Sequence, residues 1–316
     1  MAPLAGITNR PFRQIVKEKG CGLVCSEMIS ANGLVHQSSK TFKMLDSDPA
    51  EKPLSVQIFG TDPAIMAEAA RIVSDSGADI LDINFGCSVR KVVKTGAGAA
   101  LMRTPDKAEA VIAATRKAVT IPLTIKIRSG WDRSGDQAVE IARISQGCGV
   151  NAIAVHPRTA TQGFSGSADW ALIRRVKQTV GIPVVGNGDI QSPGDVIEML
   201  QQTGCDGVMI GRMAIWHPWI FSQALDKLSG RVPKQVDLND RREMMIRYLD
   251  ASIVYYGEIV ACRTMRSRLG RYVKGLSHNG RFREAIKRIR SREEALPLID
   301  RYFNELVMNE SEESSG

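Results

Sequence analysis

Short apolar runs alternate with amphipathic segments along the first two thirds of the chain. The apolar runs lie at 22–28, 54–60, 79–84, 123–128, 152–157, 182–188 and 206–212. Each is an almost continuous stretch of apolar residues, which is typical of parallel strands buried on both faces. The segments between them repeat apolar residues at helical spacing, as in 62–77 and 104–119. Asp62 and Pro63 form an N-terminal helix signal at the start of the first of these.

The repeated alternation of strand and helix along the chain predicts a TIM (β/α)8 barrel. The seven runs give seven strands, and the N-terminal segment "MAPLAG" stands where an eighth would end. We therefore expect a barrel over residues 1–232 with an incomplete first strand. A doubly wound sheet is the alternative, but the chain lacks its Gly-rich dinucleotide fingerprint after the first strand.

The pattern changes after Gly230. Residues 231–241 have the composition of a linker, and 239–308 are helical in pattern and rich in bases. Between 239 and 292 there are 14 Lys and Arg against five Asp and Glu, a net charge of +9, which leaves −1 for the rest of the +8 chain. A solvated helix face accounts for part of such an excess, but this clustering favours a polyanion such as nucleic acid. Residues 309–316 are expected to be disordered.

Other functional classes find little support in the composition. No apolar run approaches the roughly 20 residues that a membrane helix needs, and the first residues do not resemble a secretory signal. The six cysteines are scattered, which indicates reduced thiols and a cytoplasmic protein. Cys21 and Cys25 resemble half of a metal site, but no second ligand pair accompanies them, so no metal is expected.

Polar residues gather where the predicted strands end, which is where TIM barrels carry their active sites. Any one of them is equally well explained as a satisfied core residue, but the recurrence at six strand ends favours a site. The residues are Gln57, Asn84, Cys87, Lys126, Arg128, His156, Arg158, Asn187, Gly188, Asp189, Gly211 and Arg212.

The last two strands end in "GNGD" and "IGR". Barrels commonly bind phosphate at this place with backbone N–H groups, and glycines allow the backbone to approach the ligand closely. Arg212 adds a charged fork. A tight loop without a ligand remains the alternative for this pair of motifs.

Eight motifs occur in a fixed order and together resemble one family. They are "APLAGITNRPFR", "VQIFG", "INFGCSVRKV", "GAGAALM", "IKIRSGWD", "HPRTATQGFSG", "GNGDI" and "GCDGVMIGR". The set is similar to the flavin-dependent tRNA-dihydrouridine synthases, in particular their bacterial B-type branch. The similarity covers the whole barrel and continues into "RLGRYVKGL" of the basic segment.

The resemblance implies reduction of uridines in tRNA to 5,6-dihydrouridine, with FMN as cofactor, NADPH or NADH as reductant and no obligate protein partner. Cys87 would be the catalytic acid, with Asn84 and Arg128 near the target uracil. The residues around FMN would be Pro3, Leu4, Ala5, Gln57, Lys126, His156, Asn187, Gly188, Asp189, Gly211 and Arg212. In the basic segment, we expect Arg266, Arg271 and Arg290 to contact tRNA phosphates.

The chemistry agrees with these assignments. Reducing the C5–C6 bond of uracil needs a hydride, which a flavin supplies, and a proton from an acid on the other side. An ordinary thiol, with a pKa of about 8.5, is still protonated at neutral pH, and Lys126 can offset negative charge on the reduced ring. The family has proline after the catalytic cysteine where this chain has Ser88, so a looser Cys87 loop is expected.

Three other interpretations remain open at this point. A free-pyrimidine flavoenzyme like dihydroorotate dehydrogenase would share the barrel and the chemistry, but it would not need the basic segment. A non-catalytic RNA-binding barrel would not need Cys87, Lys126 and His156. A thiol nucleophile with His156 as its base is a weaker reading of the same residues.

Overall fold

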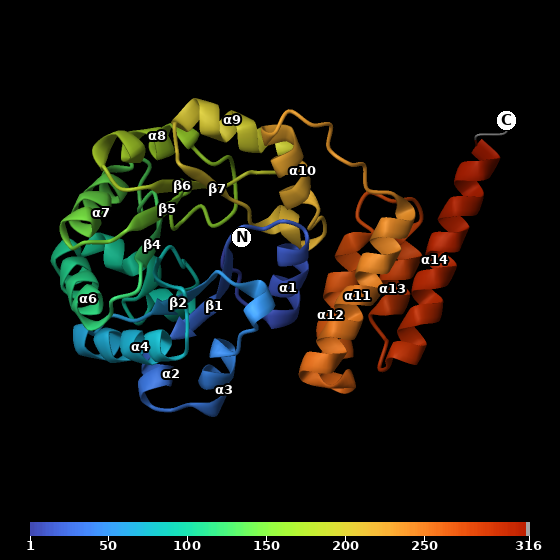
Figure 1. The fold of residues 1–316 in the computed structure, drawn as a ribbon, viewed down its shortest axis with the longest axis horizontal. Coiled ribbons are helices and arrows are strands. Elements are labelled where there is room, and N and C mark those ends of the chain that lie inside the picture. The colour runs from blue at the N-terminus through green and yellow to red at the C-terminus, as the bar shows by residue number, and fades with distance from the viewer. Residues whose placement is uncertain (314–316) are drawn as a thin grey trace.

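The computed structural model describes residues 1–313 and contains a parallel sheet with helices around it (Figure 1). The seven strands found in the described chain pair in sequence order, β1 to β7. Their bounds are β1 Val24–Ser30, β2 Leu54–Phe59, β3 Ile80–Phe85, β4 Leu123–Arg128, β5 Ala152–His156, β6 Val184–Asn187 and β7 Gly207–Met209. Each matches one of the apolar runs, and the prediction of a barrel is confirmed.

The N-terminal segment takes the eighth position without forming a strand in the described sheet. The N–H of Ala2 donates to the carbonyl of Ile210, just past β7, at 2.8 Å. The terminal amino group of Met1 donates to the carbonyl of Leu23, just before β1, at 2.7 Å. Residues 1–4 therefore lie between β7 and β1, and the sheet curls around to them.

The helices surround the sheet as the amphipathic pattern predicted. They are α1 Arg10–Glu18, α2 Ala31–Val35, α3 Ser39–Phe42, α4 Pro63–Asp75, α5 Arg90–Val93, α6 Pro105–Ala118, α7 Asp136–Gly147, α8 Trp170–Thr179, α9 Pro193–Thr203 and α10 Ile220–Leu228. The Asp62 carboxylate accepts from the N–H groups of Ala64 and Ile65 at 2.9 and 3.0 Å, as an N-cap does. No helix in residues 1–313 has the length and apolarity to cross a membrane.

Strand register brings the polar strand ends together. Asn84 of β3 pairs with Lys126 of β4, and Arg128 of β4 pairs with His156 of β5. The apolar residues of the strands are buried almost completely, as in Ile83 and Ile125 at 0% exposure. Because all strands run parallel, their carboxyl ends share one rim of the barrel, and the polar residues lie on that rim.

A helical domain packs beside the barrel (Figure 1). It consists of α11 Leu238–Tyr256, α12 Glu258–Tyr272, α13 Asn279–Ile286 and α14 Arg292–Glu313. Helix α11 lies against α1, where the rings of Phe12 and Tyr248 are 5.6 Å apart. The amide of Asn9 donates to the hydroxyl of Tyr256 at 2.9 Å. Both contacts join the helical domain to the loop and helix that follow the N-terminal segment.

The expectation of disorder over 309–316 is wrong for its first part. Helix α14 continues to Glu313, so 309–313 are helical. Once a helix has formed, each further residue closes one more backbone hydrogen bond at little additional cost in entropy. Residues 314–316 lie outside the described part of the chain.

Candidate active site

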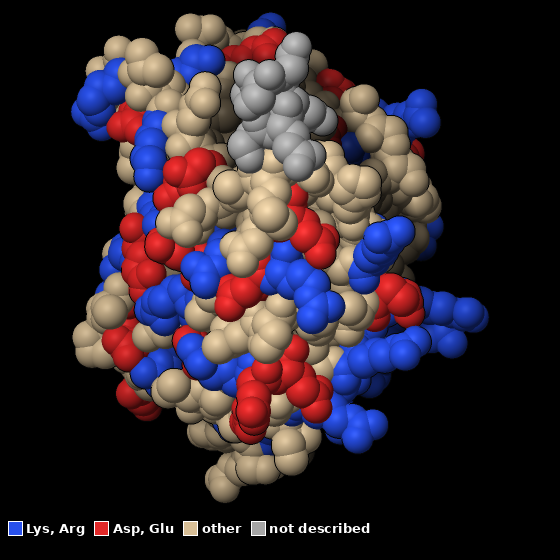
Figure 2. Space-filling model, turned by 90° about the vertical axis from the view of Figure 1, so that its right-hand side faces the viewer, with Lys and Arg blue, Asp and Glu red and all other residues tan. Residues whose placement is uncertain are grey.

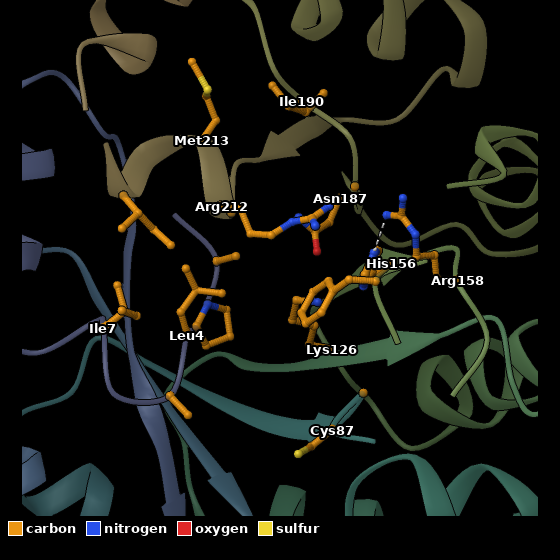
Figure 3. Close-up of a pocket in the computed structure, with 18 of the residues that line it drawn as sticks. Leu4, Ile7, Cys87, Lys126, His156, Arg158, Asn187, Ile190, Arg212 and Met213 are labelled. Atoms are coloured by element: carbon orange, nitrogen blue, oxygen red, sulfur yellow. Dashed lines mark hydrogen bonds between the residues drawn. The ribbon is translucent and has the colours of Figure 1, made fainter. Parts of the chain in front are cut away.

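A cavity of about 560 Å³ opens at the carboxyl ends of the strands. Its volume lies in the range typical of sites for small ligands. The barrel residues expected at the site from the sequence all line it: Pro3, Leu4, Ala5, Gln57, Asn84, Cys87, Lys126, Arg128, His156, Asn187, Gly188, Asp189, Gly211 and Arg212. Figure 3 labels six of them, Leu4, Cys87, Lys126, His156, Asn187 and Arg212.

A chain of buried hydrogen bonds crosses the floor of the cavity. The Asp82 carboxylate accepts from the hydroxyl of Thr124 at 2.5 Å and from the amide of Gln57 at 2.6 Å. Gln57 in turn accepts from the amide of Asn84 at 2.8 Å. Burial raises the pKa of Asp82, although the two donors oppose this shift. The chain ties three neighbouring strands together below Lys126.

Asn84 continues this chain into the loop that carries Cys87. Its side-chain oxygen accepts from the N–H of Cys87 at 2.8 Å and from that of Gly86 at 3.2 Å. Arg128 donates from Nε to the carbonyl of Gly86 at 2.7 Å. The N–H of Ala99 donates to the carbonyl of Cys87 at 2.9 Å. Two hydrogen bonds to Gly86 and two to Cys87 thus position this part of the loop, where Ser88 stands in place of the family's proline.

Arg128 also holds the loop after β5. Its Nη1 donates to the carbonyls of Thr159 and Gly163 at 3.0 and 2.9 Å, and the residue is only 5% exposed. Much of the hydrogen-bonding capacity of Arg128 and Asn84 is therefore used inside the protein. Both line the cavity, and their contact with a uracil stays a prediction.

The surroundings of Cys87 keep its sulfur protonated. Burial raises the pKa of the Cys87 thiol, while the N–H of Val89 and the charge of Arg128 oppose this shift. A thiol with a raised pKa is a proton donor at neutral pH and a poor nucleophile. The site therefore favours an acid at this position over a covalent catalyst.

Burial and the positive charge of neighbouring residues lower the pKa of both Lys126 and His156. Burial and the nearby Arg128 lower the pKa of Lys126 to about 8, against the attraction of Asp82. Burial, together with Lys126, Arg128, Arg158 and Arg212, lowers the pKa of His156 to about 2. His156 is therefore a neutral imidazole, which makes it a hydrogen-bonding group for a ligand rather than a further charge.

Arg158 organises the side of the cavity formed by β5 and β6. Its Nη2 donates to both oxygens of Asp189, at 2.8 and 2.7 Å, and to the carbonyl of Gly166 at 2.5 Å. The residue is 2% exposed. Asp189 also accepts from the N–H of Ala168 at 2.7 Å and lies 3.4 Å from Nη2 of Arg212. This network places the loops after β5, β6 and β7 relative to one another.

At Gly188 the backbone passes close to the side chains of Ala168 and His156. The φ of Gly188 is +124°, and a Cβ there would lie 2.9 Å from the Cβ of Ala168 and 3.0 Å from Cδ2 of His156. Trp170 donates to the carbonyl of Gly188 at 3.1 Å. A side chain at position 188 would thus push His156 out of place.

The donor set fits an anionic aromatic cofactor. Lys126 and Arg212 supply positive charge, neutral His156 and Gln57 supply hydrogen bonds, and the glycine loops after β6 and β7 lie where barrels bind phosphate. Leu4 and Met28 supply apolar surface for a ring. No carboxylate other than Asp189 lines the cavity among the described residues, and Asp189 is paired with Arg158.

Several cavity residues were not predicted as site residues. Arg158 was recognised only as a polar strand end, and Phe164, Trp216 and Lys274 were not singled out. Phe164 is 57% exposed at the rim, with the guanidinium of Arg212 4.8 Å from its ring centroid. An aromatic residue between two glycines just past a strand, as in "QGFSG", is the signal that would have indicated it.

The basic residues expected to bind tRNA lie outside the cavity, on the helical domain. Arg271 and Arg290 are exposed, and in the described part of the chain neither side chain forms an ion pair with a carboxylate, although the backbone N–H of Arg290 donates to the Glu294 carboxylate at 2.7 Å. Arg266 is half-buried and donates from Nε and Nη2 to the carbonyl of Ile289, at 3.0 and 2.7 Å. Arg266 therefore links α12 to the segment between α13 and α14. Figure 2 shows the face that carries α14, with many Lys and Arg side chains along one edge.

Two solved structures share the barrel. Histamine dehydrogenase from Rhizobium sp. 4-9 is 13% identical, with a TM-score of 0.53 over 78% of this chain and 47% of its own. A 2-naphthoyl-CoA reductase is also 13% identical, with a TM-score of 0.58 over 73% of this chain and 49% of its own. This chain thus spans about half of either protein, and the likeness concerns the fold. Fold and cavity together define an α/β barrel with a ligand-sized cavity at the carboxyl ends of its strands.

The family is defined more narrowly by sequence. The family model described as dihydrouridine synthase matches residues 1–307, and the chain belongs to this family. A protein of Xanthomonas axonopodis pv. citri named tRNA-dihydrouridine synthase B is 40% identical over 308 residues, 97% of this chain and 93% of its own. Proteins of the same name from Vibrio vulnificus and Pseudomonas aeruginosa are each 37% identical, over 97% and 98% of this chain and 96% and 93% of their own.

Gly188→Ala should lower the free energy of unfolding and weaken cofactor binding, because the new methyl group displaces His156. Gly77→Ala is the matched control: Gly77 also has a positive φ, +82°, but nothing lies within 4 Å of its Cβ position. The control should lose only the roughly 1–2 kcal/mol of a strained backbone. Chemical unfolding of both variants measures the difference, and equal losses would mean that the contacts of Gly188 are unimportant.

Proposed function

We propose that this protein reduces specific uridines of tRNA to 5,6-dihydrouridine, with FMN as cofactor and NADPH or NADH as reductant. The observation that carries the proposal is the position of Cys87 at the edge of a basic cavity, where burial raises the pKa of its thiol, in a chain of the dihydrouridine synthase family. The curated relatives named tRNA-dihydrouridine synthase B support tRNA as the substrate. A tRNA substrate also supports a cytoplasmic location.

We assign the cofactor to the cavity. Asn187, Gly188, Gly211 and Arg212 would hold the phosphate, and Gln57, Lys126 and His156 would contact the ring, with Pro3, Leu4 and Ala5 along one side. When bound, the flavin supplies a hydride. One phosphate-binding corner matches FMN and leaves no evident place for the adenosine half of FAD.

The residues of the chain would then perform the remaining steps. Cys87 gives its proton from Sγ to one carbon of the uracil double bond, on the side away from the hydride. Asn84 and Arg128 keep the Cys87 loop in position by their bonds to it. Lys126 offsets the negative charge that develops on the ring of the cofactor. His156 stays neutral and therefore adds no charge that would attract a competing anion.

The helical domain, residues 239–308, is proposed to bind the body of the tRNA. One nucleotide in the cavity provides too little contact for a large RNA, so phosphate contacts by Lys and Arg must supply most of the affinity. A free-pyrimidine enzyme would have no use for this surface. The charge of the domain therefore favours tRNA over a free base as the substrate.

Cys87→Ala should slow uridine reduction strongly and leave reduction of the flavin by NADPH nearly unchanged, since only uridine reduction needs the proton of the thiol. The expected loss is roughly 10²- to 10⁴-fold. Stopped-flow absorbance of the flavin measures both half-reactions separately. Ser88→Pro is the companion variant, and it should retain or raise the rate. A Cys87→Ala protein that is slow in both half-reactions would make the cysteine structural.

Uridine reduction by enzyme with pre-reduced flavin should keep its rate from pH 6.5 to beyond about 8.5, the pKa of a free thiol. Burial raises the pKa of Cys87, so the proton-donating form persists to higher pH and is lost only as pH rises through the raised pKa. Single-turnover rates over this range test the point. Flavin reduction over the same range reports the titration of Lys126 separately. A decline of uridine reduction alone, centred below pH 8, would contradict a protonated Cys87.

Arg271→Glu with Arg290→Glu should weaken tRNA binding strongly and flatten its dependence on salt, while FMN binding stays unchanged. Both side chains are exposed and without an acidic partner among the described residues, so their reversal breaks no internal ion pair. Arg143→Glu with Lys107→Glu, exposed on the barrel helices α7 and α6, carries the same change of charge as a control. The affinity for tRNA is measured at several salt concentrations for both double variants. Equal losses of affinity in the two double variants would place the tRNA-binding surface elsewhere.

A further inference from the structure

One residue of the helical domain reaches the cavity. Lys274 follows the end of α12, where its N–H donates to the carbonyl of Arg271 at 3.1 Å. Of the described residues of the helical domain, it alone lines the cavity. Its ammonium nitrogen lies 4.9 Å from the centroid of the Trp216 ring, and Trp216 follows the short helix η4 (Arg212–Ile215) after β7. Lys274 therefore stands at the junction of the two domains.

The charge of Lys274 is oriented but uncompensated. The Trp216 ring attracts the ammonium by its quadrupole and so favours one position over the many that an exposed lysine can take. In the part of the chain that the structure describes, no carboxylate lies within ion-pair distance of Lys274. Two of the arginines that line the cavity differ in this respect, because Arg158 and Arg212 both lie against Asp189.

The position of Lys274 also extends the basic surface of the helical domain to the mouth of the cavity. Arg271 is exposed three residues earlier on the same helix end, again without an acidic partner among the described residues. A polyanion lying along the helical domain would thus meet positive charge up to the point where one of its nucleotides enters the barrel.

We propose that Lys274, supported by Trp216, binds the backbone phosphate next to the uridine that enters the cavity. This inference rests on the proposed function. A nucleotide that turns out of its stack leaves its two flanking phosphates at the mouth of the pocket. A lysine provides a point charge that accepts any approach of a phosphate oxygen. Lys274 thereby fixes the depth to which the nucleotide enters.

The first experiment compares Lys274→Ala and Lys274→Arg with Lys107→Ala in the FMN-loaded protein. Lys107 is exposed on α6, away from the cavity, so its variant makes the same change of net charge. We expect Lys274→Ala to weaken binding of unmodified tRNA about fivefold and to lower the salt slope by roughly one. Lys274→Arg should restore most of the loss, and Lys107→Ala should match the wild type. An unchanged slope in Lys274→Ala overturns the proposal.

The second experiment locates the phosphate. Once the modified uridine has been mapped, tRNA carrying a neutral methylphosphonate on its 5′ or 3′ side is bound to wild type and to Lys274→Ala. Wild type should lose affinity at one of the two positions, and Lys274→Ala should be indifferent there. If the methylphosphonate at either position lowers the affinity of Lys274→Ala as much as that of wild type, Lys274 contacts neither phosphate, and the proposal is overturned.

The third measurement tests whether Lys274 binds the phosphate of FMN instead of a tRNA phosphate. Lys274→Ala should retain the FMN affinity of wild type, measured by quenching of flavin fluorescence in protein freed of cofactor. A loss of FMN affinity with tRNA binding intact would assign Lys274 to the cofactor and overturn the proposal. Wild-type protein that binds tRNA but does not reduce it would count against the proposed function and leave the comparison of Lys274 variants valid.

Discussion

The buried hydrogen-bond chain from Asp82 to the Cys87 amide is the constraint on which the site depends. It runs through Gln57 and Asn84, with links of 2.6, 2.8 and 2.8 Å, and so crosses β2 and β3 before it enters the loop. A buried carboxylate without partners would be costly, so the chain must stay complete. Because the last link of the chain is the hydrogen bond from the Cys87 N–H to Asn84, a complete chain fixes the position of this amide. The fixed backbone in turn positions the Cys87 thiol.

Burial and the positive charge of the cavity then set the protonation states of His156 and Cys87, which lie at the cavity near this hydrogen-bond chain. Burial, together with the positive charge of Lys126, Arg128, Arg158 and Arg212 in the same cavity, lowers the pKa of His156 and keeps the imidazole uncharged. The Cys87 thiol lies at the edge of the same field, where burial outweighs the pull of Arg128 and its proton is retained. A cavity that attracts an anionic cofactor can therefore keep an acid close to it, because desolvation decides the charge of each group.

The sequence determined the barrel, the polar residues that line its cavity and the basic character of the C-terminal segment. Continuous apolar runs have the composition of strands buried on both faces, and the rule that parallel strands expose their carboxyl ends on one rim collected the polar residues. All the barrel residues named in this way line the cavity. The continuation of the last helix over 309–313 was missed, since the polar composition of that segment resembles that of a disordered tail.

Tertiary structure decided what each side chain does with its hydrogen bonds and charge. Arg266 and Arg271 are alike in sequence, but the approach of α13 gives Arg266 the carbonyl of Ile289, whereas Arg271 stays free for a ligand. Packing of the helical domain beside the barrel likewise brings Lys274 to Trp216, 58 residues away along the chain. Such partners come from elements that are distant in sequence. Hydrophobic periodicity predicts only which face each element buries, so it does not predict which distant groups come into contact.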